Sequence, residues 1–165
     1  MENWKDRIEF FENGVPEIGT IWSRGDLLAK IAGDLASLAD GIEFDAIATA
    51  ETKGIIYASA LAVRMGKPLL IFRKIGRIKM TDHVYSEEFT NWRNEPDGLE
   101  IEKELLSDQR ILFVDDVIST TSTVAAVSRI LGGTNCCIVK YLCFANASKL
   151  KSFDGIEIRS LLESR

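Results

Sequence analysis

Short, continuously apolar segments alternate along this chain with segments of helical periodicity. The apolar runs with the length and composition of buried strands are residues 44–51, 68–73, 110–116 and 135–145. The segments of helical spacing or length are residues 24–40, 54–66 and 122–133. Buried strands joined by helices are typical of a mostly parallel sheet that is covered on both faces. The pattern therefore predicts an α/β fold, a mostly parallel twisted sheet flanked by helices.

Length and charge restrict both the organisation and the partners of the chain. With 165 residues, 46% of them apolar, residues 1–165 are expected to form a single domain. No apolar run reaches the roughly 18 residues that span a bilayer, and the N-terminal segment lacks the basic start and apolar stretch of a signal peptide. We therefore expect a cytoplasmic protein without a membrane partner. The formal net charge of −5 argues against a nucleic-acid partner, because sequence-independent binders carry basic surfaces.

The cysteines do not have the spacing of a metal site. Cys136, Cys137 and Cys143 lie in one apolar run without a CxxC pair, and the chain has 1 histidine. Structural zinc is therefore not expected. We interpret all of these cysteines as reduced thiols of the core, as is usual in a reducing compartment.

Residues 75–98 form a long polar segment with turn-forming residues and no sustained periodicity. Structureless segments longer than about 12–15 residues are uncommon inside compact domains and are often active-site lids. We predict a flexible lid here. The alternative is a surface hairpin that covers an edge of the sheet.

The end of the strand at 110–116 carries two kinds of polar group. Asp115 and Asp116 can accept hydrogen bonds from the vicinal hydroxyls of a sugar or hold water on Mg²⁺. The hydroxyl-rich turn that follows leads into a helix, and hydroxyls with free N–H groups at a helix start suit a phosphate. The phosphate-binding candidates are Ser119, Thr120, Thr121, Ser122 and Thr123. The alternative is that these residues only cap the helix; no GxxxxGK[ST] motif supports a P-loop.

Cations follow the other two strand ends. The turn after residues 44–51 combines a lysine with a glycine that lets backbone approach a ligand, and the run at 68–73 ends in the one basic cluster of the chain. The pyrophosphate-binding candidates are Thr52, Lys53, Gly54, Arg73, Lys74 and Arg77. Each end alone could be an ordinary turn or a solvated edge. Together the acid pair, the phosphate turn and the cations match the groups of phosphoribosyl pyrophosphate (PRPP).

The order and the amino-acid sequences of these segments resemble those of the type I phosphoribosyltransferases, most closely the adenine-specific members, over residues 44–145. The PRPP motif of that family, a strand with two acids and a phosphate loop, resembles ILFVDDVISTTST. Its adenine-specific members have segments similar to ETKGIIYASALAVRMGKPLLIFRK and GLEIEKELLSDQR. Its lid segment, which carries a catalytic glutamate, resembles YSEEF at 85–89, with about five extra residues before Leu99.

The resemblance implies the type I phosphoribosyltransferase fold, with a small N-terminal hood at residues 1–23. It also implies transfer of the 5-phosphoribosyl group from PRPP to a purine base, with adenine favoured, giving a purine nucleoside monophosphate and pyrophosphate in purine salvage. A Mg²⁺ cofactor and a homodimer follow from the same resemblance. Carried over by position, Asp115 and Asp116 would bind the ribose hydroxyls and the waters of Mg²⁺, and Glu88 would be the catalytic residue of the lid.

The hood matches the family only loosely. IGTIW at residues 18–22 resembles the segment that binds the base but lacks its proline before glycine and its Arg-Asp after the aromatic residue. Ile21 and Trp22 are the base-binding candidates, although a tryptophan here could equally serve the core or a dimer interface.

The phosphate turn also departs from the family, because Thr121 and Ser122 replace residues that are usually glycine. A β-branched residue is strained at positive φ, so we expect this turn to use negative φ angles. The altered turn and the loose hood leave a second hypothesis open, a PRPP-binding regulator without catalysis. Transfer to hypoxanthine, guanine or xanthine is a third.

Overall fold

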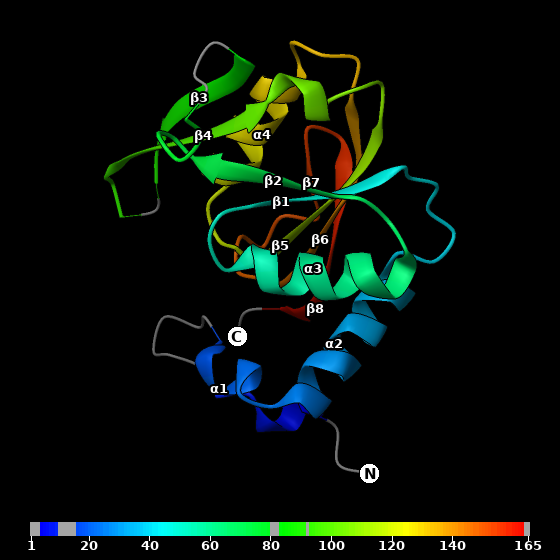
Figure 1. Cartoon of the computed structure of the whole chain (residues 1–165). Coiled ribbons are helices and arrows are strands. Elements are labelled where there is room, and N and C mark those ends of the chain that lie inside the picture. The colour runs from blue at the N-terminus through cyan, green and yellow to red at the C-terminus, as the bar shows by residue number, and fades with distance from the viewer. Residues whose placement is uncertain (1–3, 10–15, 80–82, 92, 164–165) are drawn as a thin grey trace.

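A computed structural model describes residues 4–9, 16–79, 83–91 and 93–163 of the chain. Within these residues an 8-stranded sheet has the order β3-β4-β2-β1-β5-β6-β8-β7 (Figure 1). The strands are β1 Ala46–Ala50, β2 Leu69–Lys74, β3 Val84–Thr90, β4 Pro96–Glu102, β5 Arg110–Ile118, β6 Cys137–Asn146, β7 Ser152–Phe153 and β8 Ile156–Glu163. The α-helices are α1 Gly19–Trp22, α2 Gly25–Leu38, α3 Gly54–Met65 and α4 Ser122–Leu131, and short 3₁₀ helices span Trp4–Arg7 and Lys103–Leu105.

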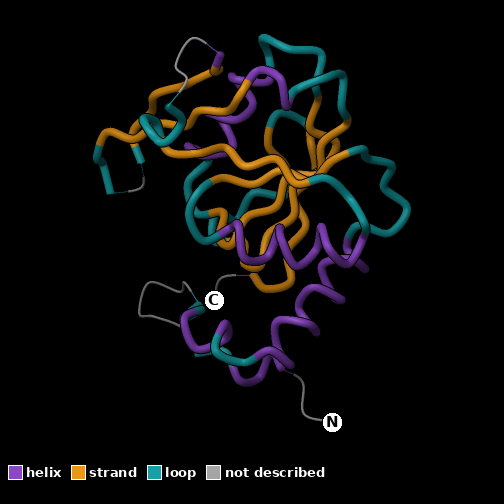
Figure 2. Tube along the Cα trace, viewed as in Figure 1, coloured by secondary structure: helices purple, strands orange, loops and turns teal. Residues whose placement is uncertain are grey.

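The centre of the sheet is parallel, as predicted. Strands β2, β1, β5, β6 and β8 pair parallel in that order. Antiparallel β4 and β3 extend one edge, and β7 adds a short antiparallel strand at the other (Figure 2). Because neighbouring parallel strands point the same way, the carboxyl ends of β1, β2 and β5 lie at one edge of the sheet.

Alternate residues of the central strands point into two separate cores. Ile47 and Leu112 belong to a cluster with α2 and α3, whereas Ala48 and Phe113 belong to a cluster with α4. Figure 1 shows α2 and α3 on one side of the sheet and α4 on the other. Burial on both faces is the reason these strands are continuously apolar in sequence. No helix in the described part of the chain is long and apolar enough to cross a membrane.

The described part of residues 75–98 is not structureless, which corrects the expectation of a segment without secondary structure. Its movement as a lid stays a prediction. Most of the segment belongs to an antiparallel hairpin of β3 and β4, in which β4 also pairs with the end of β2. The described residues therefore form a hairpin along the edge of the sheet, as in the alternative hypothesis. The sequence of β3 does not show the alternation typical of a strand, because the charged Glu87 lies between Tyr85 and Phe89 on the partly buried face. Residues 80–82 and 92 of the predicted lid lie outside the described residues.

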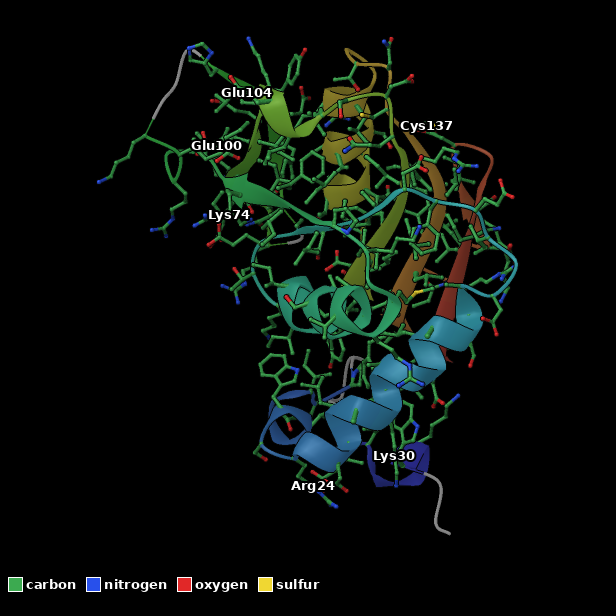
Figure 3. The ribbon with its side chains drawn as sticks, turned by 45° about the vertical axis from the view of Figure 1, so that its right-hand side comes forward. Arg24, Lys30, Lys74, Glu100, Glu104 and Cys137 are labelled. Carbon is green, nitrogen blue, oxygen red and sulfur yellow. The ribbon has the colours of Figure 1, made fainter. Side chains whose placement is uncertain are left out.

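The cysteines divide between the core and the surface. Cys136 and Cys143 are buried, and burial raises the pKa of the Cys143 thiol. Cys137 is exposed at the start of β6, so the prediction that all of the cysteines are core thiols is wrong for this residue (Figure 3).

Candidate active site

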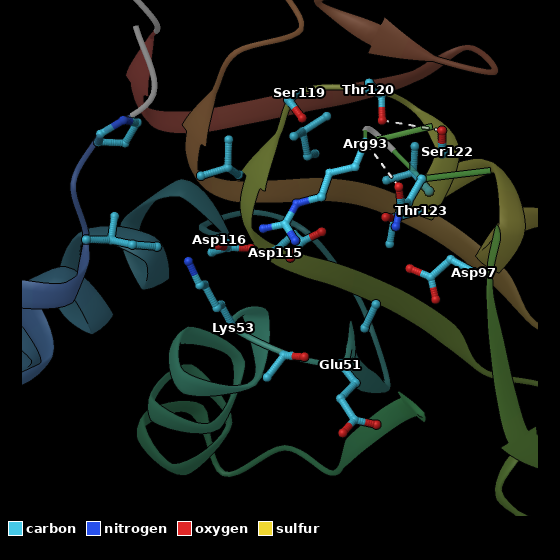
Figure 4. Close-up of a pocket in the computed structure, with 18 of the residues that line it drawn as sticks. Glu51, Lys53, Arg93, Asp97, Asp115, Asp116, Ser119, Thr120, Ser122 and Thr123 are labelled. Carbon is cyan, nitrogen blue, oxygen red and sulfur yellow. Dashed lines mark hydrogen bonds between the residues drawn. The ribbon is translucent and has the colours of Figure 1, made fainter. Parts of the chain in front are cut away.

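A cleft of about 780 Å³ lies at the carboxyl ends of β1, β2 and β5, between the described part of the N-terminal hood and the β3–β4 hairpin (Figure 4). This volume is in the range of pockets that hold small ligands. The predicted site residues that line it are Trp22, Thr52, Lys53, Lys74, Asp115, Asp116, Ser119, Thr120, Ser122 and Thr123. The predicted residues that do not are Ile21, Gly54, Arg73, Arg77, Glu88 and Thr121.

The acid pair at the end of β5 combines a buried and a more open carboxyl group. Asp115 is 8% exposed, and its Oδ1 accepts a hydrogen bond of 2.8 Å from the backbone N–H of Asp116. Burial raises the pKa of Asp115 well above its usual range, and the negative charge of Asp116 raises it further. The half-buried Asp116 faces the cleft from the same strand end. Adjacent carboxyl groups of this kind can accept hydrogen bonds from two hydroxyls of one sugar.

Gly54, the first residue of α3, packs closely against Thr49 and Asp115. A Cβ atom at Gly54 would lie 2.5 Å from Thr49 Oγ1 and 2.6 Å from Asp115 Oδ1. The first residue of α3 can therefore approach β1 and β5 only as glycine. Glycine here allows α3 to pack against Asp115. The contact of Gly54 with a ligand stays a prediction.

Lys53 and Trp22 meet at the mouth of the cleft. Lys53 lies in the turn between β1 and α3, and its Nζ is 6.0 Å from the centroid of the Trp22 ring. Trp22 Nε1 donates a hydrogen bond of 3.3 Å to Tyr57 Oη, whose pKa is raised mainly by burial. This bond holds the indole at the cleft and leaves Trp22 half-buried. Ile21, the other base-binding candidate, is 1% exposed and packs in the core on the α2 and α3 side.

The two cations that end β2 have different surroundings. Arg73 Nε lies 3.2 Å from Glu51 Oε2, which also accepts a hydrogen bond of 2.9 Å from the backbone N–H of Lys74. The Lys74 N–H and then Arg73 lower the pKa of Glu51. Lys74 pairs with Asp97 of β4 and lines the cleft. Glu51 thus holds Arg73 beside the strand end.

Arg77 is exposed beyond the end of β2. Its backbone N–H donates a hydrogen bond of 2.8 Å to Oε1 of the buried Glu100. The structure therefore places the main chain of this residue in a turn held by β4, and its side chain outside the cleft lining.

The phosphate turn has the backbone that its residues require. Thr121 has φ −84° and ψ 6°, so the expected negative φ is confirmed. Its side chain makes no capping hydrogen bond to α4, which argues against a purely capping role for this residue. Thr120 Oγ1 donates a hydrogen bond of 3.3 Å to Ser122 Oγ at the rim of the cleft (Figure 4). Hydroxyl-bearing residues at and before the start of α4 thus line the same cleft, namely Ser119, Thr120, Ser122 and Thr123.

Sequence reasoning missed the acidic and hairpin residues of the cleft. These are Glu17, Glu51, Asn91, Arg93 and Asp97. For the hairpin residues the available signal was the extra residues before Leu99, because an insertion between two strands can extend the wall of a site. Glu88 is exposed and lines a neighbouring cavity of about 610 Å³, to which Lys74 and Asp97 also contribute.

Comparisons with known proteins agree with this geometry. A family model described as a phosphoribosyl transferase domain matches residues 17–161. An adenine phosphoribosyltransferase of Ureaplasma parvum serovar 3 is 32% identical over 130 residues, which cover 77% of this chain and 73% of the relative. One of Nitrosopumilus maritimus is 27% identical over 164 residues, 93% of each chain. The crystal structure of adenine phosphoribosyltransferase from Thermoanaerobacter pseudethanolicus has a TM-score of 0.84 at 25% identity and covers 96% of both chains. This chain therefore belongs to the phosphoribosyltransferase family.

Proposed function

We propose that this protein transfers the 5-phosphoribosyl group of PRPP to a purine base, with adenine favoured, and releases a purine nucleoside monophosphate and pyrophosphate. The observation that carries the proposal is the meeting of an acid pair, a hydroxyl-rich helix start and two lysines in one cleft. The names of the relatives support adenine as the acceptor. The protein would act in purine salvage, as a cytoplasmic homodimer without a nucleic-acid or membrane partner.

Each group of PRPP has a complementary part of the cleft. The 5′-phosphate would bind at the start of α4, where N–H groups and the positive end of the helix dipole favour an anion. Asp115 and Asp116 would accept hydrogen bonds from the ribose hydroxyls. Thr52, Lys53 and Lys74 would bind the pyrophosphate, and Trp22 would pack against the base in the hood.

The reaction would be a displacement at C1 of the ribose. A ring nitrogen of the base forms the new C–N bond, the C1–O bond to pyrophosphate breaks, and the proton on the base nitrogen is lost. The transition state has oxocarbenium character, so positioning and electrostatics would supply most of the catalysis. Lys53 and Lys74 would stabilise the charge that develops on the leaving pyrophosphate, and closure of the cleft would exclude water.

The acid pair also fits Mg²⁺. This ion prefers one or two carboxylates together with substrate phosphates and water, and Asp116 offers a half-buried carboxylate in the cleft. The described residues contain no group of three or more metal-ligating side chains, so the substrate would provide the remaining ligands. Mg²⁺, when bound, would neutralise part of the charge of pyrophosphate.

A competition between acceptors tests the proposal. The protein is incubated with PRPP, Mg²⁺ and equal amounts of adenine, hypoxanthine, guanine and xanthine, and the nucleotides formed are separated by mass. We expect AMP as the main product. If a 6-oxopurine nucleotide forms in its place, the acceptor is that 6-oxopurine base. If no nucleotide forms, the PRPP-binding regulator is favoured.

Thr123→Val tests the phosphate site. This change removes a hydroxyl and keeps the branched shape, so PRPP should bind roughly tenfold more weakly, as expected for one hydrogen bond to a charged oxygen. Binding of free base should stay the same. Calorimetric titration measures both, with Thr123→Ser as the control that keeps the hydroxyl. If Thr123→Val binds PRPP with wild-type affinity, this hydroxyl only caps the start of α4 and does not bind the phosphate.

Glu88→Gln tests the proposed catalytic glutamate. If Glu88 reaches the cleft during the reaction and accepts a proton, the chemical step should slow by about 10²–10⁴-fold while substrate affinity changes little. Rapid-quench measurement of a single turnover separates the two effects. Glu104→Gln, at an exposed carboxylate outside both cavities, is the control. A loss of affinity with an intact chemical step would exclude a transition-state role.

A further inference from the structure

The turn between β3 and β4 is held in a defined conformation by one side chain. Asn91 Oδ1 accepts hydrogen bonds from the backbone N–H groups of Arg93 at 2.9 Å and Glu95 at 3.1 Å. The backbone N–H of Asn91 donates to the carbonyl of Glu95 at 2.9 Å, and that of Asn94 donates to the carbonyl of Asn91 at 2.9 Å. Asn94 has φ +62°, in the left-handed region that asparagine tolerates. The conformation of Arg93 is therefore tied to Asn91.

The hairpin that carries this turn is anchored to the rest of the protein. β4 pairs with the end of β2, and Glu87 of β3 forms an ion pair with Arg129 of α4. Tyr85 and Phe89 pack against the core on the α4 side of the sheet. The turn is thus held beside the cleft that α4 helps to form.

Arg93 reaches from this turn into the cleft. Figure 4 shows its guanidinium pointing toward Asp115 and Asp116, into the same space that Lys53 enters from the turn before α3. Two cations on separate elements therefore converge in front of the acid pair.

The balance of charge in the cleft affects how an anionic ligand can bind there. Among the described lining residues, the carboxyl groups of Glu17, Glu51, Asp97, Asp115 and Asp116 outnumber the cationic groups of Lys53, Lys74 and Arg93. Lys74 is already paired with Asp97. A ligand with several negative charges therefore needs cationic groups from more than one element, and Lys53 and Arg93 come from two separate turns. A guanidinium can bind two phosphate oxygens through parallel N–H groups.

We propose that Arg93 binds the pyrophosphate group of PRPP opposite Lys53. This inference rests on the proposed function and adds a binding residue to it. Arg93 lies in the turn between β3 and β4, which borders the cleft. The hairpin would then supply an anion-binding side chain as well as covering the edge of the sheet.

The test compares two ligands that share the sugar phosphate and differ in pyrophosphate. PRPP and ribose 5-phosphate are titrated calorimetrically, with Mg²⁺, into the wild type and Arg93→Gln. We expect PRPP to bind about tenfold more weakly to the variant and ribose 5-phosphate to bind equally well. Arg93→Lys should recover part of the PRPP affinity. Arg64→Gln, which removes the same charge at an exposed site outside the cleft lining, should bind both ligands as the wild type does.

A second variant tests the role of the turn. Asn91→Ala should weaken PRPP binding in the same direction, and adding Arg93→Gln to it should have less effect than in the wild type, because the two residues act together. Full additivity would show that the guanidinium acts without the Asn91 turn and would overturn that part of the proposal.

The remaining outcomes separate this inference from the proposed function. Unchanged PRPP affinity in Arg93→Gln, or equal weakening of PRPP and ribose 5-phosphate, would overturn the pyrophosphate role and leave the proposed function standing. A wild-type protein that binds ribose 5-phosphate but shows no added affinity for PRPP would overturn both.

Discussion

Replacing Asp115 and Asp116 together by asparagine is expected to lower kcat/KM for phosphoribosyl transfer by about 10³-fold or more, since a single preorganised polar contact can contribute about 10²–10³-fold. The amides keep the size of the carboxyl groups but lose their charge, so they bind ribose hydroxyls less well and do not hold a cation. Pyrophosphate release from PRPP with adenine measures the loss.

The fold should survive this double substitution. An amide oxygen at residue 115 can still accept the hydrogen bond from the backbone N–H of residue 116, and removing two adjacent like charges relieves repulsion. Thermal unfolding and circular dichroism provide the control. Wild-type turnover in the folded variant would refute the role of the acid pair in binding ribose, whereas an unfolded variant would assign the pair to stability.

Gly54→Ala is expected to reduce both stability and PRPP affinity. The new Cβ would lie 2.5 Å from Thr49 Oγ1, 2.6 Å from Asp115 Oδ1 and 3.3 Å from Asp115 Cα, so the helix start must move away from β1 and β5. Overpacking of this kind typically costs about 1–3 kcal/mol of the free energy of unfolding. The same movement would displace Asp115 from the cleft. Urea denaturation and calorimetric titration with PRPP measure the two effects.

Gly25→Ala is the matched control for this prediction. Gly25 is also the first residue of a helix, and a Cβ atom there would meet nothing within 4 Å. Its unfolding free energy should equal or exceed that of the wild type, because alanine limits the unfolded chain more than glycine does. Thr49→Ala in the Gly54→Ala background should restore part of the loss. If Gly54→Ala is as stable as Gly25→Ala and binds PRPP normally, the packing account of Gly54 is wrong.

The central part of the fold could be predicted because its strands are buried on both faces. Neighbouring residues such as Leu112 and Phe113 pack into opposite cores, so residues 111–114 of β5 are all apolar. The β3 strand lacked this signal, because Glu87 points toward α4 and forms an ion pair there. The backbone of Thr121 was predictable for a local reason, the steric limit on a β-branched side chain.

The candidate site could be predicted where its residues follow directly from strand ends. Asp115 and Lys53 come at the carboxyl ends of parallel strands, which meet at one edge of the sheet. Arg73 is also at a strand end, but Glu51 holds it, and this contact depends on the pairing of β1 with β2. Arg93 enters the cleft only because the hairpin folds back onto β2 and α4, which no local pattern indicates.

Pyrophosphate release from PRPP in the presence and absence of adenine tests the central claim most directly. With Mg²⁺ present, the wild-type protein should release one pyrophosphate for each AMP formed, and release without a base should be far slower. Binding of PRPP without pyrophosphate release for adenine, hypoxanthine, guanine or xanthine would contradict the account and identify a regulator, and equally fast release without any base would identify a hydrolase.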